Sequence, residues 1–301
     1  MPLSRKPFSR ETLGLLLGFV GITIFGGTLP VTRIVVAGLD PLFLAAGRGA
    51  GGGVLALVVL CVMRQPFPKR EHWLRMFVNM LCLAIGFPLF SALGSVSVPS
   101  AHGGVVIGLT PLLTAIVAAI WSGERPSVAF WLCSCAGASV VVVYALRQGG
   151  GGLAIGDLYL LAAVGVAAIG YTLSAELSRV MPGWVVISWA LVFCFPFTAP
   201  VALWYWPANP MQVPATIWLA FAYLFIFPQY LGFFAWNAGL AMGGTARVSQ
   251  VQLLQTFVTI TLAALIVGET IDAETIIAAI VVVGLVFLGR TLRIGQKARA
   301  I

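Results

Sequence analysis

The chain has 301 residues, of which 60% are hydrophobic and only 9% are charged, whereas soluble domains carry about 25% charged residues. This composition excludes an ordinary water-soluble domain, because too little polar surface is available to face water. The 17 Lys and Arg outnumber the 9 Asp and Glu and give a net charge of +8, but they lie at the chain ends and in alternate loops, which argues against a nucleic-acid-binding patch.

Apolar segments of membrane-crossing length follow one another along the whole chain. A helix needs about 20 mostly apolar residues to cross a bilayer. Splitting the sequence at charged, Gly-rich and Pro-containing breaks gives segments at 12–36, 41–63, 73–95, 102–121, 127–146, 156–176, 184–206, 214–239, 247–267 and 274–293. The first is too long for a signal-peptide core, so we interpret it as a span. The pattern predicts an all-α integral membrane protein with ten transmembrane helices.

Basic residues are unequally shared between the two sides of this predicted bundle. If both termini are cytoplasmic, fourteen of the 17 Lys and Arg lie on the inner side, only Arg33 and Arg147 lie on the outer side, and Arg48 falls within the second span. Cytoplasmic loops are enriched in Lys and Arg. We therefore expect both termini in the cytoplasm, and we expect the protein in a bacterial cytoplasmic (inner) membrane.

The second half of the chain repeats the first. A shift of 145 residues places Trp73 on Trp218 and Gly123-Glu124 on Gly268-Glu269 without a gap. Each half then holds five spans, and because five is odd the second half enters the membrane from the opposite side. We predict two inverted five-helix repeats, at 1–148 and 156–301, joined by a Gly-rich periplasmic linker at 149–155. Inverted repeats of this kind enclose a central cavity in many transporters.

Short motifs in both halves resemble those of the drug/metabolite transporter superfamily, in its ten-helix EamA-type branch. The matching residues are Gly26-Gly27, Pro30, Arg48, Leu109-Thr110-Pro111, Gly123-Glu124-Arg125, Gly156-Asp157-Leu158 and Gly268-Glu269. Within that branch the chain looks most similar to YddG-like exporters of aromatic amino acids. The resemblance implies a cavity lined chiefly by spans three, four, eight and nine, with parts of one and six.

The ninth span carries a polar stripe. Ser249, Gln252, Thr256 and Thr259 follow one another at steps of three, four and three residues, which places them on one helical face with Gln255 beside them. Uncharged polar groups are poor neighbours for lipid, so the stripe faces either a wet cavity or another helix. We take Gln252, Gln255 and Thr256 as candidate substrate-binding residues, with hydrogen bonding between helices as the alternative.

Further candidates lie on helices that the resemblance places at the cavity. The polar ones are Asn79, Gln229, Tyr230 and Asn237. The aromatic ones, which would form apolar walls for a large side chain, are Phe87, Phe90, Tyr171 and Trp189. Ordinary packing between helices is the alternative for each of them.

Two basic residues, His102 and Arg247, are candidates for attracting a carboxylate, and a third, Arg48, is an isolated cation within a span. His102 and Arg247, which correspond at the 145-residue offset, begin the fourth and ninth spans, where helix N-termini carry partial positive charge. The alternative is that His102 is an interfacial residue and Arg247 a topogenic charge. Arg48 lies several residues inside a span, either as a functional cation or with its head group reaching the outer interface.

The sequence favours a secondary transporter that exports amino acids, with aromatic or large apolar ones as candidates, by alternating access. No Asp or Glu lies between Glu11 and Asp40, so the first span lacks a central carboxylate, and both proton coupling and uniport stay open. The rivals are a carrier of a sugar derivative, purine or drug, a membrane scaffold, and a lipid-modifying enzyme. Absence of a His-rich cluster and of a P-loop disfavours enzymes, and we expect no cofactor, metal or nucleic-acid partner. A monomer is compatible with the sequence.

Overall fold

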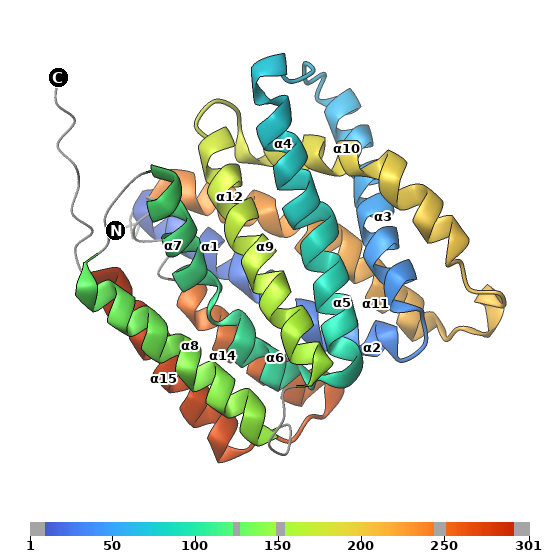
Figure 1. The fold of residues 1–301 in the computed structure, drawn as a ribbon. Helices are drawn as coiled ribbons and strands as arrows, with labels where there is room; N and C mark the ends of the chain where they lie inside the picture. Colours follow the sequence, from blue (N-terminus) through green and yellow to red (C-terminus); the bar gives the residue numbers. More distant parts are fainter. Residues whose placement is uncertain (1–9, 123–126, 149–153, 244–250, 292–301) are drawn as a thin grey trace, which may run out of the picture.

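Every regular element that the structure describes is a helix (Figure 1). The computed structural model describes residues 10–122, 127–148, 154–243 and 251–291. Over these ranges the predicted all-α architecture is confirmed. The Gly123-Glu124-Arg125 motif, Arg247, Ser249, both chain ends and most of the predicted linker lie outside the described residues.

Helices in the first half are joined by short connections. They are α1 (Arg10–Gly26), α2 (Thr28–Val36), α3 (Pro41–Val62), the 3-10 turn η1 (Arg70–His72), α4 (Trp73–Asn79), the π-helical stretch η2 (Met80–Gly86), α5 (Phe87–Ser97), α6 (Ser100–Ile107), α7 (Thr110–Ser122) and α8 (Val128–Gln148).

The second half of the chain is helical as well. They are α9 (Ile155–Leu177), α10 (Gly183–Trp204), the 3-10 turn η3 (Pro210–Gln212), α11 (Ala215–Ile226), the π-helical stretch η4 (Phe227–Leu231), α12 (Gly232–Gly243), the 3-10 turn η5 (Gln252–Leu254), α14 (Gln255–Leu262), the π-helical stretch η6 (Ala263–Val267) and α15 (Ala273–Thr291).

In the part of the chain that the structure describes, eight helical stretches are long and apolar enough to cross a membrane. They run over Arg10–Val36, Pro41–Val62, Arg70–Ser97, Ser100–Trp121, Trp131–Gln148, Ile155–Leu177, Gly183–Trp204 and Ala215–Gly239. Each coincides within a few residues with one of the first eight predicted spans. The ninth and tenth predicted spans correspond to shorter apolar helices over Gln252–Val267 and Ala273–Leu288.

Aspartates begin two of these helices by accepting free backbone N–H groups. The Asp40 carboxylate accepts from the N–H of Leu42 at 2.7 Å at the start of α3, and that of Asp272 accepts from the N–H of Thr275 at 2.7 Å at the start of α15. Hydrogen bonds from Thr275 and then from Gln148 hold the pKa of the Asp272 carboxyl below its ordinary value. The cap of α15 therefore stays ionised at neutral pH.

The helices pack in pairs that respect the 145-residue correspondence. α3 packs on α10 and α8 on α15, so each of these helices contacts its own counterpart. α1 lies along α12, and the corresponding helices α9 and α5 also lie side by side. The π-helical stretch η2 ends at Gly86 and η4 ends at Leu231, and these two positions coincide at the 145-residue offset. The same local irregularity therefore recurs in both halves.

Glycines allow the closest of these approaches. A Cβ added at Gly239 of α12 would lie 2.7 Å from the backbone nitrogen of Gly18 in α1, and one at Gly21 would lie 3.1 Å from Trp236. Small residues let helix backbones approach each other within a membrane, where lipid supplies no hydrophobic driving force between helices. Large apolar side chains such as Leu74 and Leu265 stay 75% and 77% exposed on the outside of the bundle, where lipid would cover them.

Candidate functional site

A polar pocket lies inside the bundle, between four of its spans. Its lining residues come from α5, α6, α7, α9, η5 and α14 and are Phe87, Gly104, Ile107, Gly108, Thr110, Pro111, Ala167, Tyr171, Gln252, Gln255, Thr256 and Thr259. The cavity that these side chains enclose is about 20 Å³, which is room for about one water molecule. The pocket is therefore contracted, and its walls must separate before a solute enters.

The fourth span breaks where it lines this pocket. Pro111 has no N–H to donate to the carbonyl of Ile107, four residues earlier. The hydroxyl of Thr110 donates to that carbonyl instead, at 2.7 Å. At this point α6 ends at Ile107 and α7 begins at Thr110. The break turns Thr110 and Pro111 toward the pocket without leaving the Ile107 carbonyl unpaired.

Two glycines bring α6 close to α14 at the pocket wall. A Cβ on Gly104 would lie 3.0 Å from the Cγ2 of Thr259, and one on Gly108 would lie 2.7 Å from the Oγ1 of Thr256. Both threonines are 4% exposed. The predicted polar stripe therefore meets a neighbouring helix along Thr256 and Thr259, and also lines the pocket.

Gln252 and Gln255 contribute the amides of the pocket. Both side chains are half-buried, and neither is hydrogen-bonded to another of the described residues. A half-buried amide offers two donors and one acceptor to whatever occupies the space beside it. Phe87 and Tyr171 line the same pocket and give it aromatic surface. Five predicted site residues are thus brought together here: Phe87, Tyr171, Gln252, Gln255 and Thr256.

The other polar candidates lie between helices rather than on this pocket. Asn79 donates to the carbonyl of Gly170 at 2.8 Å, and the hydroxyls of Tyr230 and Ser188 lie 2.9 Å apart. Asn237 packs against α10, where a Cβ on Gly183 would lie 2.6 Å from its Nδ2. Gln229 accepts from Arg48, as described below.

The remaining aromatic and basic candidates also lie elsewhere. The Phe90 ring stacks with that of Tyr159, with centroids 6.4 Å apart, and Trp189 packs edge-on to Phe67 at 4.9 Å. His102 is 6% exposed near the start of α6. The expected contribution of span eight to the cavity is absent from this pocket for the described residues, because α12 packs along α1 instead.

Sequence analysis missed the partner of His102. Its Nε2 lies 2.7 Å from the Oδ1 of Asp157 in the first turn of α9, and both side chains are buried. The Asp157 Oδ2 accepts from the N–H of Ala154, so the same carboxylate also caps α9. The carboxylate that His102 attracts is therefore one of the protein's own. Asp157 belongs to the Gly156-Asp157-Leu158 motif, but the two partners are 55 positions apart, so the sequence did not reveal their contact.

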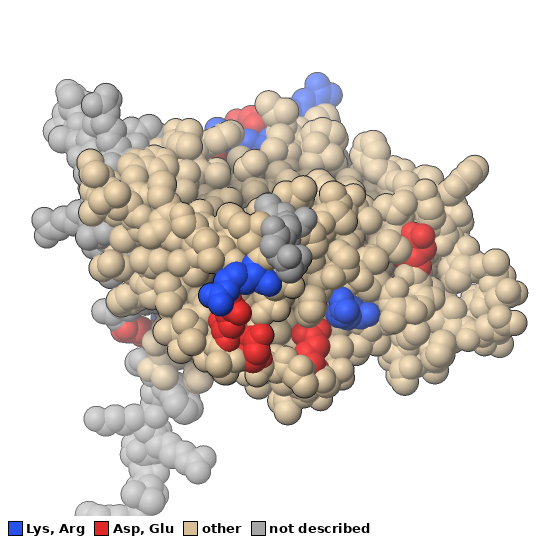
Figure 2. Space-filling view, turned by 60° about the horizontal axis from the view of Figure 1, so that its bottom comes forward, with Lys and Arg blue, Asp and Glu red and all other residues tan. Residues whose placement is uncertain are grey.

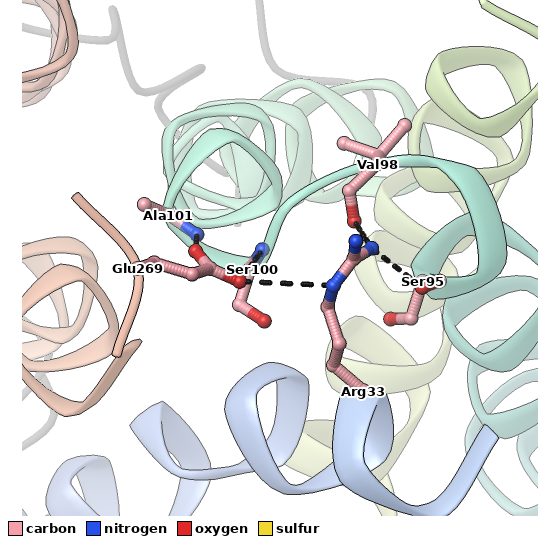
Figure 3. Close-up of polar contacts among 6 residues, drawn as sticks. All are labelled: Arg33, Ser95, Val98, Ser100, Ala101 and Glu269. Carbon is pink, nitrogen blue, oxygen red and sulfur yellow. Dashed lines mark hydrogen bonds and ion pairs between the residues drawn. The ribbon is translucent and has the colours of Figure 1, made fainter. Parts of the chain in front are cut away.

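A second carboxylate, that of Glu269, joins several helices at one end of the bundle. Figure 3 shows Glu269, in the loop before α15, reaching the first turn of α6 and the side chain of Arg33. Its two oxygens accept from the N–H groups of Ser100 and Ala101, each at 2.8 Å, and Oε1 lies 3.9 Å from the Nε of Arg33. Backbone N–H groups at a helix N-terminus and a guanidinium are both favourable neighbours for a carboxylate.

Arg33 extends this cluster to the third span. Its Nη1 donates to the carbonyl of Ser95 at 3.0 Å and to that of Val98 at 2.8 Å (Figure 3). α2, α5, α6 and the loop after η6 therefore meet at one point. Figure 2 looks onto this end of the bundle, where a few acidic and basic side chains gather on a face that is otherwise uncharged. Arg147 and Glu274 form a further ion pair at 3.0 Å, between the end of α8 and the start of α15.

A bundle of membrane-length helices around a buried polar pocket is the architecture of a membrane transport protein. The model of the EamA-like transporter family matches the chain twice, over residues 12–146 and 154–290. The chain belongs to this family, within the drug/metabolite transporter superfamily, and is a multi-pass membrane transporter.

Two relatives and one solved structure agree with this assignment. The chain is 42% identical over 263 residues to the uncharacterized transporter YdeK of Bacillus subtilis, covering 87% of this chain and 92% of the relative. It is 29% identical over 240 residues to the aromatic amino acid exporter YddG of Ancylobacter novellus, covering 76% and 79%. A solved crystal structure superposes with a TM-score of 0.60 at 23% identity, covering 95% of this chain and all of that one, and so shares its fold.

Proposed function

We propose that this transporter exports amino acids, with aromatic or large apolar ones preferred, across a bacterial cytoplasmic membrane. The observation that carries the proposal is the pocket between α5, α6, α9 and α14, which combines free amides with aromatic walls. Amides both donate to and accept from a zwitterion, while Phe87 and Tyr171 offer apolar contact to a side chain. The 29% identity to an exporter of aromatic amino acids adds support.

Alternating access is the mechanism that we propose for this export. The recurrence of the packing pairs and of η2 and η4 at the 145-residue offset supports two inverted repeats, at 1–148 and 156–301, that rock about the pocket. With both termini in the cytoplasm, the cluster around Glu269 lies at the outer end, and its contacts keep that end closed. Breaking these contacts would open the pocket outward.

A transport assay tests the proposal directly. Proteoliposomes loaded with labelled phenylalanine should release it faster than liposomes without the protein. An excess of leucine or tryptophan should slow the release of the labelled phenylalanine by competing with it. Parallel assays with a sugar derivative and a purine separate the rival substrates, and a run with and without a proton gradient separates uniport from proton coupling. Release of no amino acid above the control would remove the substrate proposal and leave the family assignment intact.

A further inference from the structure

Arg48 of α3 is a buried cation with most of its hydrogen-bonding capacity unused. The residue is 1% exposed, and its Nη2 donates to the Oε1 of Gln229 at 3.0 Å. Its Nε and Nη1 are buried without an acceptor, and none of the described carboxylates forms an ion pair with it. Because a guanidinium has five N–H groups, four remain available. A buried charge without a counter-ion is expensive in a membrane, so such a residue points to function.

Close packing around α3 keeps lipid and water away from this cation. A Cβ at Gly47 would lie 2.6 Å from the ring of Phe221 in α11, and one at Gly49 would lie 2.9 Å from Thr198 in α10. The glycines on either side of Arg48 therefore let α3 contact two helices of the second half at once. A guanidinium that only reached for the membrane surface would not need to be enclosed in this way.

Gln229 connects Arg48 to η2, the π-helical stretch that leads into α5. Its Nε2 donates to the carbonyl of Leu83 over a long 3.4 Å. Both residues lie in π-helical stretches, Gln229 in η4 and Leu83 in η2, where the normal helical pairing of carbonyls is interrupted. Phe87, which lines the pocket, comes one helical turn after Leu83. A shift of α5 that widens the pocket at Phe87 would also disturb the weak contact that covers Arg48.

We propose that Arg48 binds the carboxylate of the transported solute after this shift, with Gln229 holding the guanidinium in place beforehand. The inference rests on the proposed function and narrows its substrates to solutes that carry a carboxylate. Arginine suits this role because its planar fork donates two parallel hydrogen bonds to a carboxylate. The amide of Gln229 is a neutral partner that a carboxylate displaces without leaving a second buried charge behind.

Direct binding to the purified full-length protein in nanodiscs tests the inference. Three ligands differ at the relevant groups: phenylalanine, phenylalaninamide, which lacks the carboxylate, and 3-phenylpropanoate, which lacks the amine. Wild type should bind phenylalanine at least about tenfold more tightly than phenylalaninamide, the range of one charge-assisted hydrogen bond. Arg48→Gln should reduce that preference to within about threefold, and Arg48→Lys should keep part of it, because the charge remains but the fork is lost.

Arg147→Gln, at the 70% exposed surface arginine, is the matched control and should keep the wild-type preference. If Arg48→Gln does not fold, the proposal is still tested by the wild-type preference for phenylalanine over phenylalaninamide and by the size of that preference in Arg48→Lys. Equal binding of phenylalanine and phenylalaninamide by wild type would overturn the role of Arg48 and leave amino-acid export standing. Binding of 3-phenylpropanoate but not phenylalanine, lost in Arg48→Gln and only weakened in Arg48→Lys, would leave Arg48 as an anion site and remove amino acids as substrates. Binding of neither carboxylate would remove both proposals.

Discussion

The carboxylate of Glu269 lies between the guanidinium of Arg33, 3.9 Å away, and the first N–H groups of α6, 2.8 Å away. Glu269 is only 13% exposed in its side chain, so water screens this cluster weakly. Three separate parts of the chain are held together by one side chain. A single substitution at this residue is therefore the most economical way to loosen that end of the bundle.

Glu269→Gln is expected to open the pocket from the Glu269 end. Glutamine retains one acceptor oxygen but loses the charge that Arg33 and the start of α6 stabilise, a loss of about 2 kcal/mol, or up to about thirtyfold in the open population. In a background without native cysteines, Gln255→Cys is the reporter, and its labelling by an impermeant maleimide from outside should speed up several-fold. Glu274→Gln, at a half-exposed acid of the same end, is the control and should leave the rate unchanged.

Gln252→Ala and Gln255→Ala are expected to lower transport at unchanged membrane abundance. Neither amide is hydrogen-bonded to another described residue, so its removal costs little in folding. Loss of one substrate hydrogen bond corresponds to about fivefold to tenfold in transport rate at low substrate concentration. Transport per molecule is obtained from initial rates and quantitative blots. The control is Gln212→Ala, at an exposed glutamine, which should transport as wild type does. If the membrane abundance of Gln252→Ala and Gln255→Ala falls in proportion to their transport, the two amides have a structural role instead.

Asp157→Ala is expected to destabilise the fold more than Asp157→Asn. Alanine removes both the acceptor for His102, 2.7 Å away, and the cap for the N–H of Ala154, 3.0 Å away. Leaving a buried partner unpaired costs about 1–3 kcal/mol, and loss of a cap about 1 kcal/mol. Asparagine keeps an acceptor for one of the two. Thermal unfolding of the purified proteins should rank wild type above Asp157→Asn and that above Asp157→Ala, and any other order would contradict the double role.

Gly108→Ala is expected to impair transport by separating α6 from α14. The new methyl would lie 2.7 Å from the Oγ1 of Thr256, inside contact distance, so one helix has to move. Overpacking of this kind costs about 1–3 kcal/mol. Adding Thr256→Ala should recover part of the lost stability, which a double-mutant cycle measures. Gly165→Ala, where a Cβ meets nothing within 4 Å, is the control and should behave as wild type.

Sequence periodicity predicted the helices well but predicted their contacts poorly. Apolar length alone located eight spans within a few residues, because lipid demands that length. The stripe with Gln252 and Thr256 was also visible, since residues on one face recur at helical spacing. Which helix that face meets depends on how the helices rotate and cross. The spacing of residues along the sequence does not specify this rotation and crossing.

The contacts that sequence could not predict are those between distant residues. Arg48 and Gln229 are 181 positions apart, and His102 and Asp157 are 55 apart. Gln229 was expected at the cavity on the strength of a resemblance, yet the π-helical stretch that contains it turns the amide toward Arg48. Such stretches have no simple residue signature, so the direction of the side chains beyond them requires the folded coordinates.

The π-helical stretches η2 and η4 are two equivalent places at which the helices of the transporter could be rewound. η2 and η4 occupy equivalent places in halves that we propose to be oppositely oriented, so straightening one would favour access from one side of the membrane and straightening the other would favour the reverse. Deleting one residue from either stretch would restore ordinary helical winding there. A pair of single deletions would then trap complementary conformers of the same carrier, a practical route to capturing both ends of its cycle.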